Sequence, residues 1–295
     1  MRILITGAGG FLGGRLVQRL APTHEVIALV RRAPASPRAA ARYVEQDLGR
    51  PLDRAQLPAQ LDAIIHQAAL IDGAGQADEL LFRVNVIATW ELLRYAEAAG
   101  CARFVHASTG GVYGCRNRPF VESDPFNPMD LYSLTKAQAE LAVQAAPGDF
   151  HRVVLRYFFP YGVGTPNPIP QWVRRALSDD PLPVSRRGVP RMNPLHVDDA
   201  VEATVAALQL NQRAVVNIAG DEVTTIAALA QLAAAHAGRQ ANLVTVADDT
   251  LLPYYRADLV ADTTRMRQLL RFSPSISLAE GIAELARDAN QADAH

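Results

Sequence analysis

Short apolar runs alternate with helix-like patterns through the first half of the chain. The apolar runs lie at 2–5, 26–30, 63–66, 104–107 and 153–157. Between them, apolar residues recur at helical spacing over 10–21, 78–99 and 131–146. Because parallel strands need helical crossovers, this alternation predicts an α/β fold, a doubly wound parallel sheet with helices on both faces.

The pattern changes after residue 160. Residues 160–194 are rich in proline and contain one helical pattern at 171–177. Further on we expect a helix at 198–210, a strand at 215–218 and helices near 224–237 and 278–288. These patterns predict a first domain of residues 1–160, to which 194–220 return, and a smaller lobe made of 161–193 and 221–295. Ligands of open α/β sheets bind beyond the carboxyl ends of the strands, so the active site is expected in the cleft between sheet and lobe.

Composition narrows the class of protein. The chain has 295 residues, of which 49% are hydrophobic and 20% charged, with a net charge of -1. These values are ordinary for a globular enzyme and give no electrostatic reason to expect nucleic acid or an anionic membrane as partner. The first apolar strand starts at Arg2, and no run is long enough to span a membrane, so we expect no signal peptide and no anchor. Cys101 and Cys115 lack metal-ligand spacing, which predicts free thiols, no metal and a cytoplasmic location.

The first apolar run ends in a glycine-rich turn that opens directly into a helical pattern, TGAGGFLG at 6–13. Gly7 permits a sharp turn, Gly10 lets the backbone approach phosphates, and Gly13 lets the helix pack close to the strand. The helix start then offers unpaired N–H groups and the positive end of a dipole. A purely structural turn is the alternative, but this order of elements favours binding of a dinucleotide pyrophosphate.

A second group of residues combines a tyrosine, a lysine and a hydroxyl-rich strand end. Tyr132 and Lys136 are four apart and share one face of the helix predicted at 131–146. Upstream, the run at 104–114 ends a strand in hydroxyl residues and glycines. By itself, an exposed tyrosine and lysine at this spacing also occur often by chance.

Together these segments resemble the extended short-chain dehydrogenase/reductase family, also called the NAD-dependent epimerase/dehydratase family, and within it nucleotide-sugar 4-epimerases and ketoreductases. The resemblance implies a Rossmann-type sheet with a small C-terminal substrate lobe. It also implies that Tyr132, Lys136 and Thr109 are catalytic, with Ser108 as the neighbouring alternative to Thr109 and Asn85 as a further member. Lys136 would also hold the nicotinamide ribose. A free tyrosine titrates near pH 10, and the ammonium of Lys136 together with an oxidised nicotinamide would favour its phenolate. Lowering the pKa of Tyr132 by roughly 3 units needs about 4 kcal/mol, so the resemblance implies a lowered pKa and a tyrosine that exchanges a proton with a substrate alcohol. Asn85 has an alternative role in packing or capping a helix.

The same resemblance assigns the remaining positions. Those expected at the cofactor are Gly7, Gly9, Gly10, Phe11, Leu12, Gly13, Arg31, Arg32, Asp47, Leu48, Gln67, Ala68, Ala69, Tyr132, Lys136, Tyr157 and Pro160. Those expected at the substrate are Thr109, Phe159, Arg191 and Arg256. His196 is expected to be structural, and Arg191 has the alternative of being a surface charge.

The chain departs from the family pattern at three places. Many relatives end the second strand with an aspartate that binds both adenosine ribose hydroxyls, whereas this strand ends in Arg31-Arg32. Arginine can meet a 2′-phosphate, so NADP is expected, with NAD as the alternative if both arginines are solvated loop charges. Phe159 stands where sugar-nucleotide enzymes often have asparagine. Gly110 and Gly111 follow Thr109, where dehydratases carry a carboxylate, so dehydration is not expected.

The expected function is hydride transfer at a secondary alcohol or ketone, with C4 of a nucleotide sugar as the leading substrate position. The alternative enzyme is an NADP-dependent reductase of a non-sugar ketone. A cofactor-binding regulatory protein without catalysis is a third reading, although it would be expected to lack Tyr132 or Lys136, and both are present. The resemblance further implies a homodimer formed through the helices near 78–99 and 131–146.

Overall fold

The computed structural model describes residues 1–35, 40–71, 78–251 and 255–292 and divides the chain into two compact units. The first unit comprises Met1–Val112, Pro128–Arg156 and Val201–Val216, and the second comprises Tyr113–Asn127, Tyr157–Ala200 and Asn217–His295. Substrate binding by residues 161–193 and 221–295 stays a prediction. No helix within the described ranges is long and apolar enough to cross a membrane.

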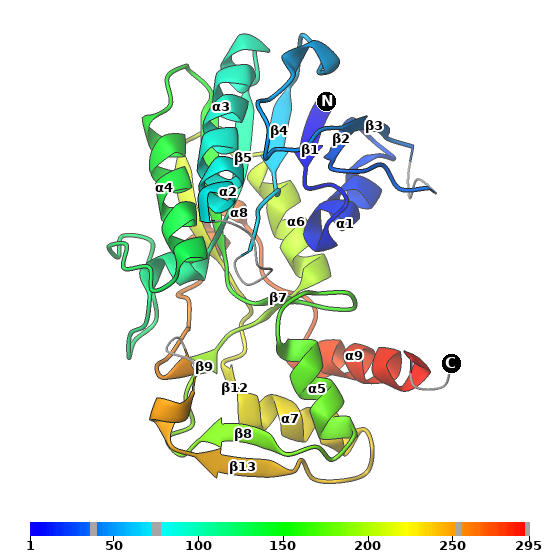
Figure 1. Ribbon diagram of the computed structural model, residues 1–295, viewed down its shortest axis with the longest axis vertical. Coiled ribbons are helices and arrows are strands. Elements are labelled where there is room, and N and C mark those ends of the chain that lie inside the picture. Colours follow the sequence, from blue (N-terminus) through cyan, green and yellow to red (C-terminus); the bar gives the residue numbers. More distant parts are fainter. Residues whose placement is uncertain (36–39, 72–77, 252–254, 293–295) are drawn as a thin grey trace. The chain divides into compact units, whose positions relative to one another are not determined.

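A seven-stranded sheet in the order β11-β6-β5-β4-β1-β2-β3 forms the centre of the fold (Figure 1). Its strands are β1 (Arg2–Thr6), β2 (Glu25–Val30), β3 (Arg42–Glu45), β4 (Ala63–His66), β5 (Arg103–Thr109), β6 (His151–Tyr157) and β11 (Ala214–Ile218). Parallel pairing joins β1 to β2 and β4, β2 to β3, and β4 to β5. The predicted α/β fold and its strands are confirmed. Only β3 was not predicted, because polar and apolar residues alternate over its four residues and it is an edge strand of the sheet.

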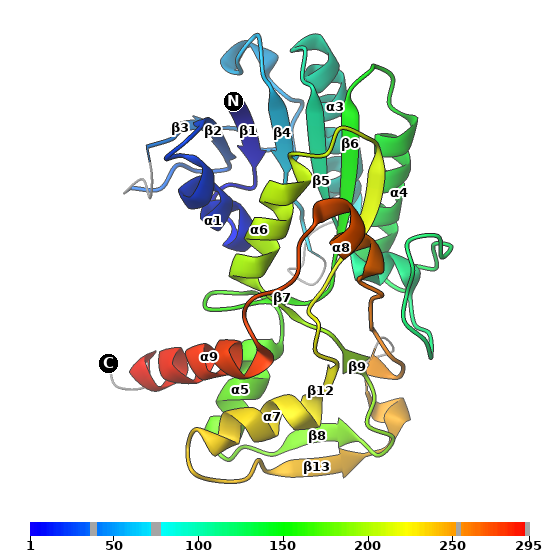
Figure 2. The same ribbon diagram turned by 180° about the vertical axis from the view of Figure 1, so that it is seen from behind.

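Helices cover both faces of this sheet in the first unit (Figures 1 and 2). One face carries α1 (Phe11–Leu20) and α6 (Val197–Ala207), which an ion pair between Arg19 and Glu202 joins. The other face carries α2 (Asp78–Phe82), α3 (Ala88–Ala98) and α4 (Leu131–Ala145). A short 3₁₀ turn, η1 (Arg54–Gln56), precedes β4.

The helix predicted at 78–99 is continuous in the chain but contains a π-helical turn, η2 (Arg83–Ile87), between α2 and α3. Such turns are often found at functional sites. Asn85 lies in this turn and is fully buried. Apolar periodicity could not reveal the extra residue, because the helix continues on both sides with the same buried face.

The second unit has its own helical core (Figure 2). It contains β7 (Pro160–Tyr161), α5 (Ile169–Leu177), β8 (Leu182–Ser185), β9 (Arg191–Met192), β10 (Leu195–His196), β12 (Thr224–Thr225), α7 (Ile226–Ala235), β13 (Leu243–Val246), η4 (Asp248–Thr250), α8 (Thr264–Leu270) and α9 (Leu278–Ala292), while η3 (Gly110–Tyr113) leads into it. Helices α5, α7 and α9 pack together through buried residues that include Ile169, Leu229 and Ile282. The predicted longer helices are present, whereas the strands of two to four residues were too short to foresee.

Candidate active site

The glycine-rich turn after β1 has the shape that an anion needs. Gly7 has φ +66, a left-handed conformation that strongly favours glycine, and a Cβ at Gly13 would overlap the carbonyl oxygen of Gly7. Gly10 is the N-cap of α1, no described side chain caps this helix, and its first turn carries no acidic residue. The first N–H groups and the positive dipole end of α1 are thus left to a ligand. This cradle fits a dinucleotide pyrophosphate.

Arg31 and Arg32 follow β2 directly, and both are exposed. The strand end that carries them lies beside the turn, since the Val30 side chain would stand 3.7 Å from a Cβ built on Gly9. Two exposed arginines therefore lie next to the glycine-rich turn. At the positions directly after β2 the chain carries these two arginines and no carboxylate.

Two more segments border the same end of the sheet. Asp47 is exposed, and its Oδ1 accepts the backbone N–H of Gly49 at 2.9 Å, while Leu48 is buried. The run 67–69 follows β4, and the backbone N–H of Ala68 donates to Thr6 Oγ1 at 3.2 Å. Of the other positions expected at the cofactor, Tyr157 and Pro160 belong to the second unit.

Lys136 is the only lysine in the chain, and the other 28 of the 29 basic residues are arginines. It lies on α4 one helical turn after Tyr132, and only 1% of it is exposed. Burial lowers the pKa of Lys136 to about 8, against the opposing effect of Glu140. Arginine keeps its proton in proteins, whereas a buried lysine can titrate. The single lysine of the chain is thus buried and can lose its proton at a pH that no arginine reaches.

Tyr132 differs from expectation in its protonation. Burial raises the pKa of Tyr132 to about 12, and the carboxylate of Asp130 adds to the effect. The expected lowering is therefore wrong for the protein by itself, because desolvation of the phenolate is not offset by Lys136. Tyr132 holds its proton at neutral pH, which suits it to donate that proton.

Thr109 is brought to the start of α4 by a close contact. The hydroxyl of Thr109 accepts the backbone N–H of Gly111 at 3.1 Å. A Cβ at Gly111 would overlap Ser133 Oγ, which Asp130 holds at the N-terminus of α4. Because Ser133 adjoins Tyr132 in sequence, the Thr109 turn packs against the segment that carries the tyrosine.

Ser108 points into the interior of the first unit. Its hydroxyl donates to the carboxylate of Glu140, which is fully buried. Arg156 donates to the same carboxylate, with Nε–Oε1 and Nη2–Oε2 distances of 3.0 and 2.6 Å, and is 3% exposed. This buried ion pair anchors α4 to β6 and β5 one turn beyond Lys136. The Ser108 hydroxyl hydrogen is committed to it.

Both ends of the Asn85 carboxamide form hydrogen bonds within the protein. Its Oδ1 accepts the backbone N–H of Leu70 at 2.8 Å, and its Nδ2 donates to the Leu70 carbonyl at 2.9 Å and to Thr135 Oγ1 at 2.9 Å. Thr135 donates in turn to the backbone carbonyl of Tyr132 at 2.7 Å. Asn85 therefore joins the π turn to the first turn of α4.

A buried histidine beneath the cofactor turn has a fixed tautomer, which we assign from its partners. Thr89 donates to the Asn85 carbonyl at 2.7 Å, so its oxygen accepts from His66 Nε2 at 2.9 Å. His66 Nδ1 is then an acceptor for the hydroxyl of Thr6 at 2.7 Å. Burial, with a smaller contribution from Lys136, lowers the pKa of His66 to about 3, so the ring is neutral.

Phe159 has a backbone conformation that is rare for its residue type. It has φ 44, and its partly buried side chain packs against the core of the second unit. A bulky residue in the left-handed region is a genuine outlier, whereas asparagine is enriched there. The chain therefore tolerates strain to keep an aromatic side chain at this position, and such strain is typical of functional sites.

The two arginines expected at the substrate are already bonded within the second unit. Arg191 Nε donates to Asp258 Oδ2 at 2.9 Å, although its side chain is 56% exposed. Arg256 is exposed and donates to the carbonyls of Leu251 and Asp249 at 2.9 and 2.7 Å. His196, expected to be structural, is buried, with its Nε2 3.0 Å from Glu284 Oε2.

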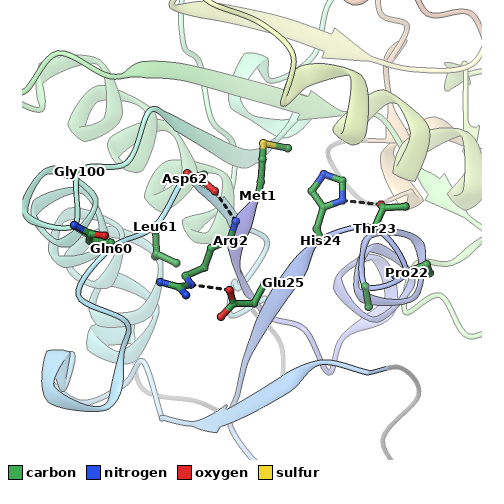
Figure 3. A pocket seen from close by; sticks show the side chains of 12 residues that line it. Met1, Arg2, Pro22, Thr23, His24, Glu25, Gln60, Leu61, Asp62 and Gly100 are labelled. Carbon is green, nitrogen blue, oxygen red and sulfur yellow. Dashed lines mark hydrogen bonds and ion pairs between the residues drawn. The ribbon is translucent and has the colours of Figure 1, made fainter.

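A hollow of 640 Å³ lies at the other end of β1 and β2, at their amino ends (Figure 3). Arg2, Glu25 and Asp62 at its wall bond to one another: Arg2 Nε lies 2.9 Å from Glu25, and the Arg2 backbone N–H donates to Asp62 at 2.6 Å. It contains none of the residues that the sequence singled out. Although the hollow is large, it is not the candidate active site, because none of the candidate catalytic or cofactor residues line it.

Two buried residues in contact with the candidate site were missed by sequence reasoning. Glu140 continues the Tyr132–Lys136 face by one more turn, and this spacing could have revealed it. His106 interrupts the apolar run of β5, and a polar residue inside a buried strand is a signal in itself.

The comparisons with known proteins agree on one family. The model of the NAD dependent epimerase/dehydratase family matches residues 3–219. A 3-diazoavenalumate denitrifying reductase from Streptomyces sp is 31% identical and covers 75% of this chain and 77% of its own. A dTDP-6-deoxy-L-talose 4-dehydrogenase (NAD(P)(+)) from Kitasatospora kifunensis is 30% identical, covering 96% and 94%. The solved structure of MoeE5 in complex with UDP-glucose and NAD has a TM-score of 0.84 and 27% identity and covers 100% of both chains.

Proposed function

The chain belongs to the NAD-dependent epimerase/dehydratase family of extended short-chain dehydrogenases/reductases, and on this premise we propose that it transfers hydride at C4 of a nucleotide sugar, as a 4-epimerase or 4-ketoreductase. The observation that carries the proposal is the single lysine, buried one turn after Tyr132. Similarity to MoeE5 with UDP-glucose and to the talose 4-dehydrogenase supports the substrate class.

The residues divide the work as follows. A bound nicotinamide dinucleotide supplies or accepts the hydride. Tyr132 gives its phenolic proton to the substrate oxygen in the reducing direction and takes it back in the oxidising direction. Thr109 orients that oxygen through its hydroxyl, while Lys136 binds the ribose and stabilises the charge that develops on Tyr132. Asn85 is a positioning residue, since it acts through Thr135 and the first turn of α4.

The segment after Thr109 bears on the type of reaction. Gly110 and Gly111 have no side chain, and the space at Gly111 is filled by Ser133. Neither position can therefore supply the carboxylate that would remove a substrate proton in a dehydration. We therefore propose redox chemistry at the substrate without loss of water.

One observation favours a second candidate, an NADP-dependent reductase of a non-sugar substrate. Phe159 places an aromatic ring where an amide would contact a sugar nucleotide, and it does so at the expense of backbone strain. The similar denitrifying reductase is named for a substrate that is not a nucleotide sugar.

The two candidates differ in what happens to the cofactor. An epimerase must recover the hydride that it removed, so its cofactor stays bound through the cycle, whereas a reductase exchanges its cofactor in every turnover. The test is to denature purified protein and assay the supernatant for NAD(H) and NADP(H). We expect near-stoichiometric cofactor for an epimerase, together with interconversion of UDP- or dTDP-sugars without added nucleotide. Empty protein that oxidises NADPH only with a non-sugar ketone would overturn the nucleotide-sugar proposal.

We also propose that two copies of the chain associate through the faces of α3 and α4, which lie side by side (Figure 1). Four large apolar side chains on this part of the first unit are more than a third exposed: Ile87, Trp90, Leu134 and Leu141. Apolar residues gathered on one face mark an association surface.

Light scattering should give twice the 31.9 kDa chain mass for the unmodified protein. Trp90→Glu together with Leu141→Glu should give the mass of a single chain. Val244→Glu, also exposed but on β13, is the control, and a monomer in the unmodified protein would contradict the proposal.

A further inference from the structure

His106 lies under the site on β5, in the strand that ends at Thr109. None of its surface is exposed, and its Nε2 lies 3.4 Å from the Nζ of Lys136. Its ring is 5.2 Å from that of His66, between centroids. Neither histidine touches solvent, so both belong to the interior support of α4 and the strand ends.

The proton on His106 can be assigned. Burial, the charge of Lys136 and then His66 hold the pKa of His106 well below its usual range, so the ring is neutral and carries one hydrogen. An ammonium can only donate, so Nε2 accepts from Lys136 and the hydrogen is on Nδ1. That Nδ1 has no hydrogen-bond partner among the described residues. A buried donor without a partner costs free energy that an apolar side chain would avoid.

We propose that His106 is a positioning residue for Lys136, which it holds by accepting one ammonium hydrogen at Nε2. This bond fixes the end of the longest side chain on the buried face of α4. It leaves two of the three ammonium hydrogens for other partners, which under the proposed function are the ribose and Tyr132. Placing the Nε2 acceptor next to Lys136 leaves the Nδ1 hydrogen of His106 without a partner in the part of the chain that the structure describes, and this costs free energy.

The charge on Lys136 depends on what faces it from each element. Glu140 on α4 favours the ammonium, and it is itself paired with Arg156 on β6. His106 on β5 and His66 on β4 are neutral, and Tyr132 on α4 is protonated. His106 is therefore the neutral acceptor that stabilises the charged form, in addition to Glu140. Removing it must lower the pKa of Lys136 further.

The single lysine makes a direct measurement possible. Protein labelled with ¹³C and ¹⁵N only in lysine gives one side-chain signal, whose shift against pH reports Lys136. A hydrogen bond to a charged group is strong enough to move the pKa by about 1–2 units. We expect His106→Leu to lower the pKa of Lys136 by that amount, and His106→Gln, which keeps an acceptor, to restore most of it. His151→Leu, at the start of β6, is the control and should leave it unchanged.

A second measurement needs no variant in this strand. In ¹⁵N-histidine-labelled protein near pH 6.5, where Lys136 is charged, the His106 signals should report a protonated Nδ1 and an unprotonated Nε2. Lys136→Met should abolish this preference. An Nε2–H tautomer in the unmodified protein, or an unchanged Lys136 signal in His106→Leu, would overturn the proposal.

The consequence for the reaction rests on the proposed function and is tested separately. If charged Lys136 is needed, the alkaline limb of kcat/KM should move to lower pH in His106→Leu by the same 1–2 units, and return in His106→Gln. A protein that shows the expected spectra but no hydride transfer would refute the proposed function and leave the His106–Lys136 contact standing. An active protein whose alkaline limb does not move would refute the role of His106 in the reaction.

Discussion

Tyr132→Phe should lower turnover by roughly 10²–10⁴-fold, the usual contribution of a positioned general acid or base. The substitution removes only the phenolic oxygen, and with it the proton that the substrate oxygen exchanges. Cofactor affinity should stay within about twofold, because it rests on the Gly7–Gly13 turn and on the start of α1. Steady-state rates and cofactor titration by fluorescence measure the two effects.

A matched control is available on β3. Tyr43→Phe removes the same atom from a partly buried tyrosine outside the candidate site, and it should leave turnover unchanged. Turnover near that of the unmodified protein in Tyr132→Phe would rule out the catalytic assignment. Loss of cofactor binding together with turnover would show instead that the tyrosine supports the fold of α4.

Replacing both Arg31 and Arg32 with alanine should weaken NADPH binding by roughly 10–150-fold and leave NADH binding nearly unchanged. Both guanidinium groups are exposed at the end of β2 beside the phosphate cradle, and charge-assisted bonds to a 2′-phosphate are among the strong ones. NADH has a hydroxyl in that place, so it has no such bonds to lose. Binding of each reduced nucleotide to the same preparation gives the ratio.

The control for charge is a second pair of neighbouring arginines. Arg174→Ala with Arg175→Ala removes the same two charges from exposed positions on α5 and should not alter the NADPH to NADH ratio. Equal affinity of the unmodified protein for the two nucleotides would refute the choice of NADP. It would also give weight to the NAD that is bound in the MoeE5 structure.

Local sequence patterns were sufficient for most of the sheet. Buried strands such as β4 and β6 contain short apolar runs, 63–65 and 153–155, so their positions could be predicted from the sequence, and the glycine turn after β1 follows from its spacing. Strand β3 and the two-residue strands were missed because they contain too few residues for a period. The π turn at Asn85 was missed because it is set by bonds to Leu70 and Thr135, which lie 15 and 50 residues away.

The chemistry of the site was less predictable than its location. Tyr132 and Lys136 could be paired from their spacing, yet the direction of the Tyr132 pKa depends on burial and on Asp130. The resemblance placed Thr109 at the site with Ser108 as the alternative, but only the structure shows that the Ser108 hydroxyl donates to Glu140, which pairs with Arg156. Desolvation and long-range pairing arise from the folded arrangement, and neither has a local signature.

The hydrogen bonds around His66 also determine where protons cannot travel. The series runs from the Ala68 amide to Thr6, His66 and Thr89 and ends at a backbone carbonyl. Proton hopping needs one end that releases a proton and another that takes it up, and neither an amide N–H nor an amide carbonyl does so at ordinary pH. Each hydroxyl and the ring have their one hydrogen already directed. Under the cofactor turn the first unit is thus an insulator for protons along this series, in spite of being rich in hydrogen bonds.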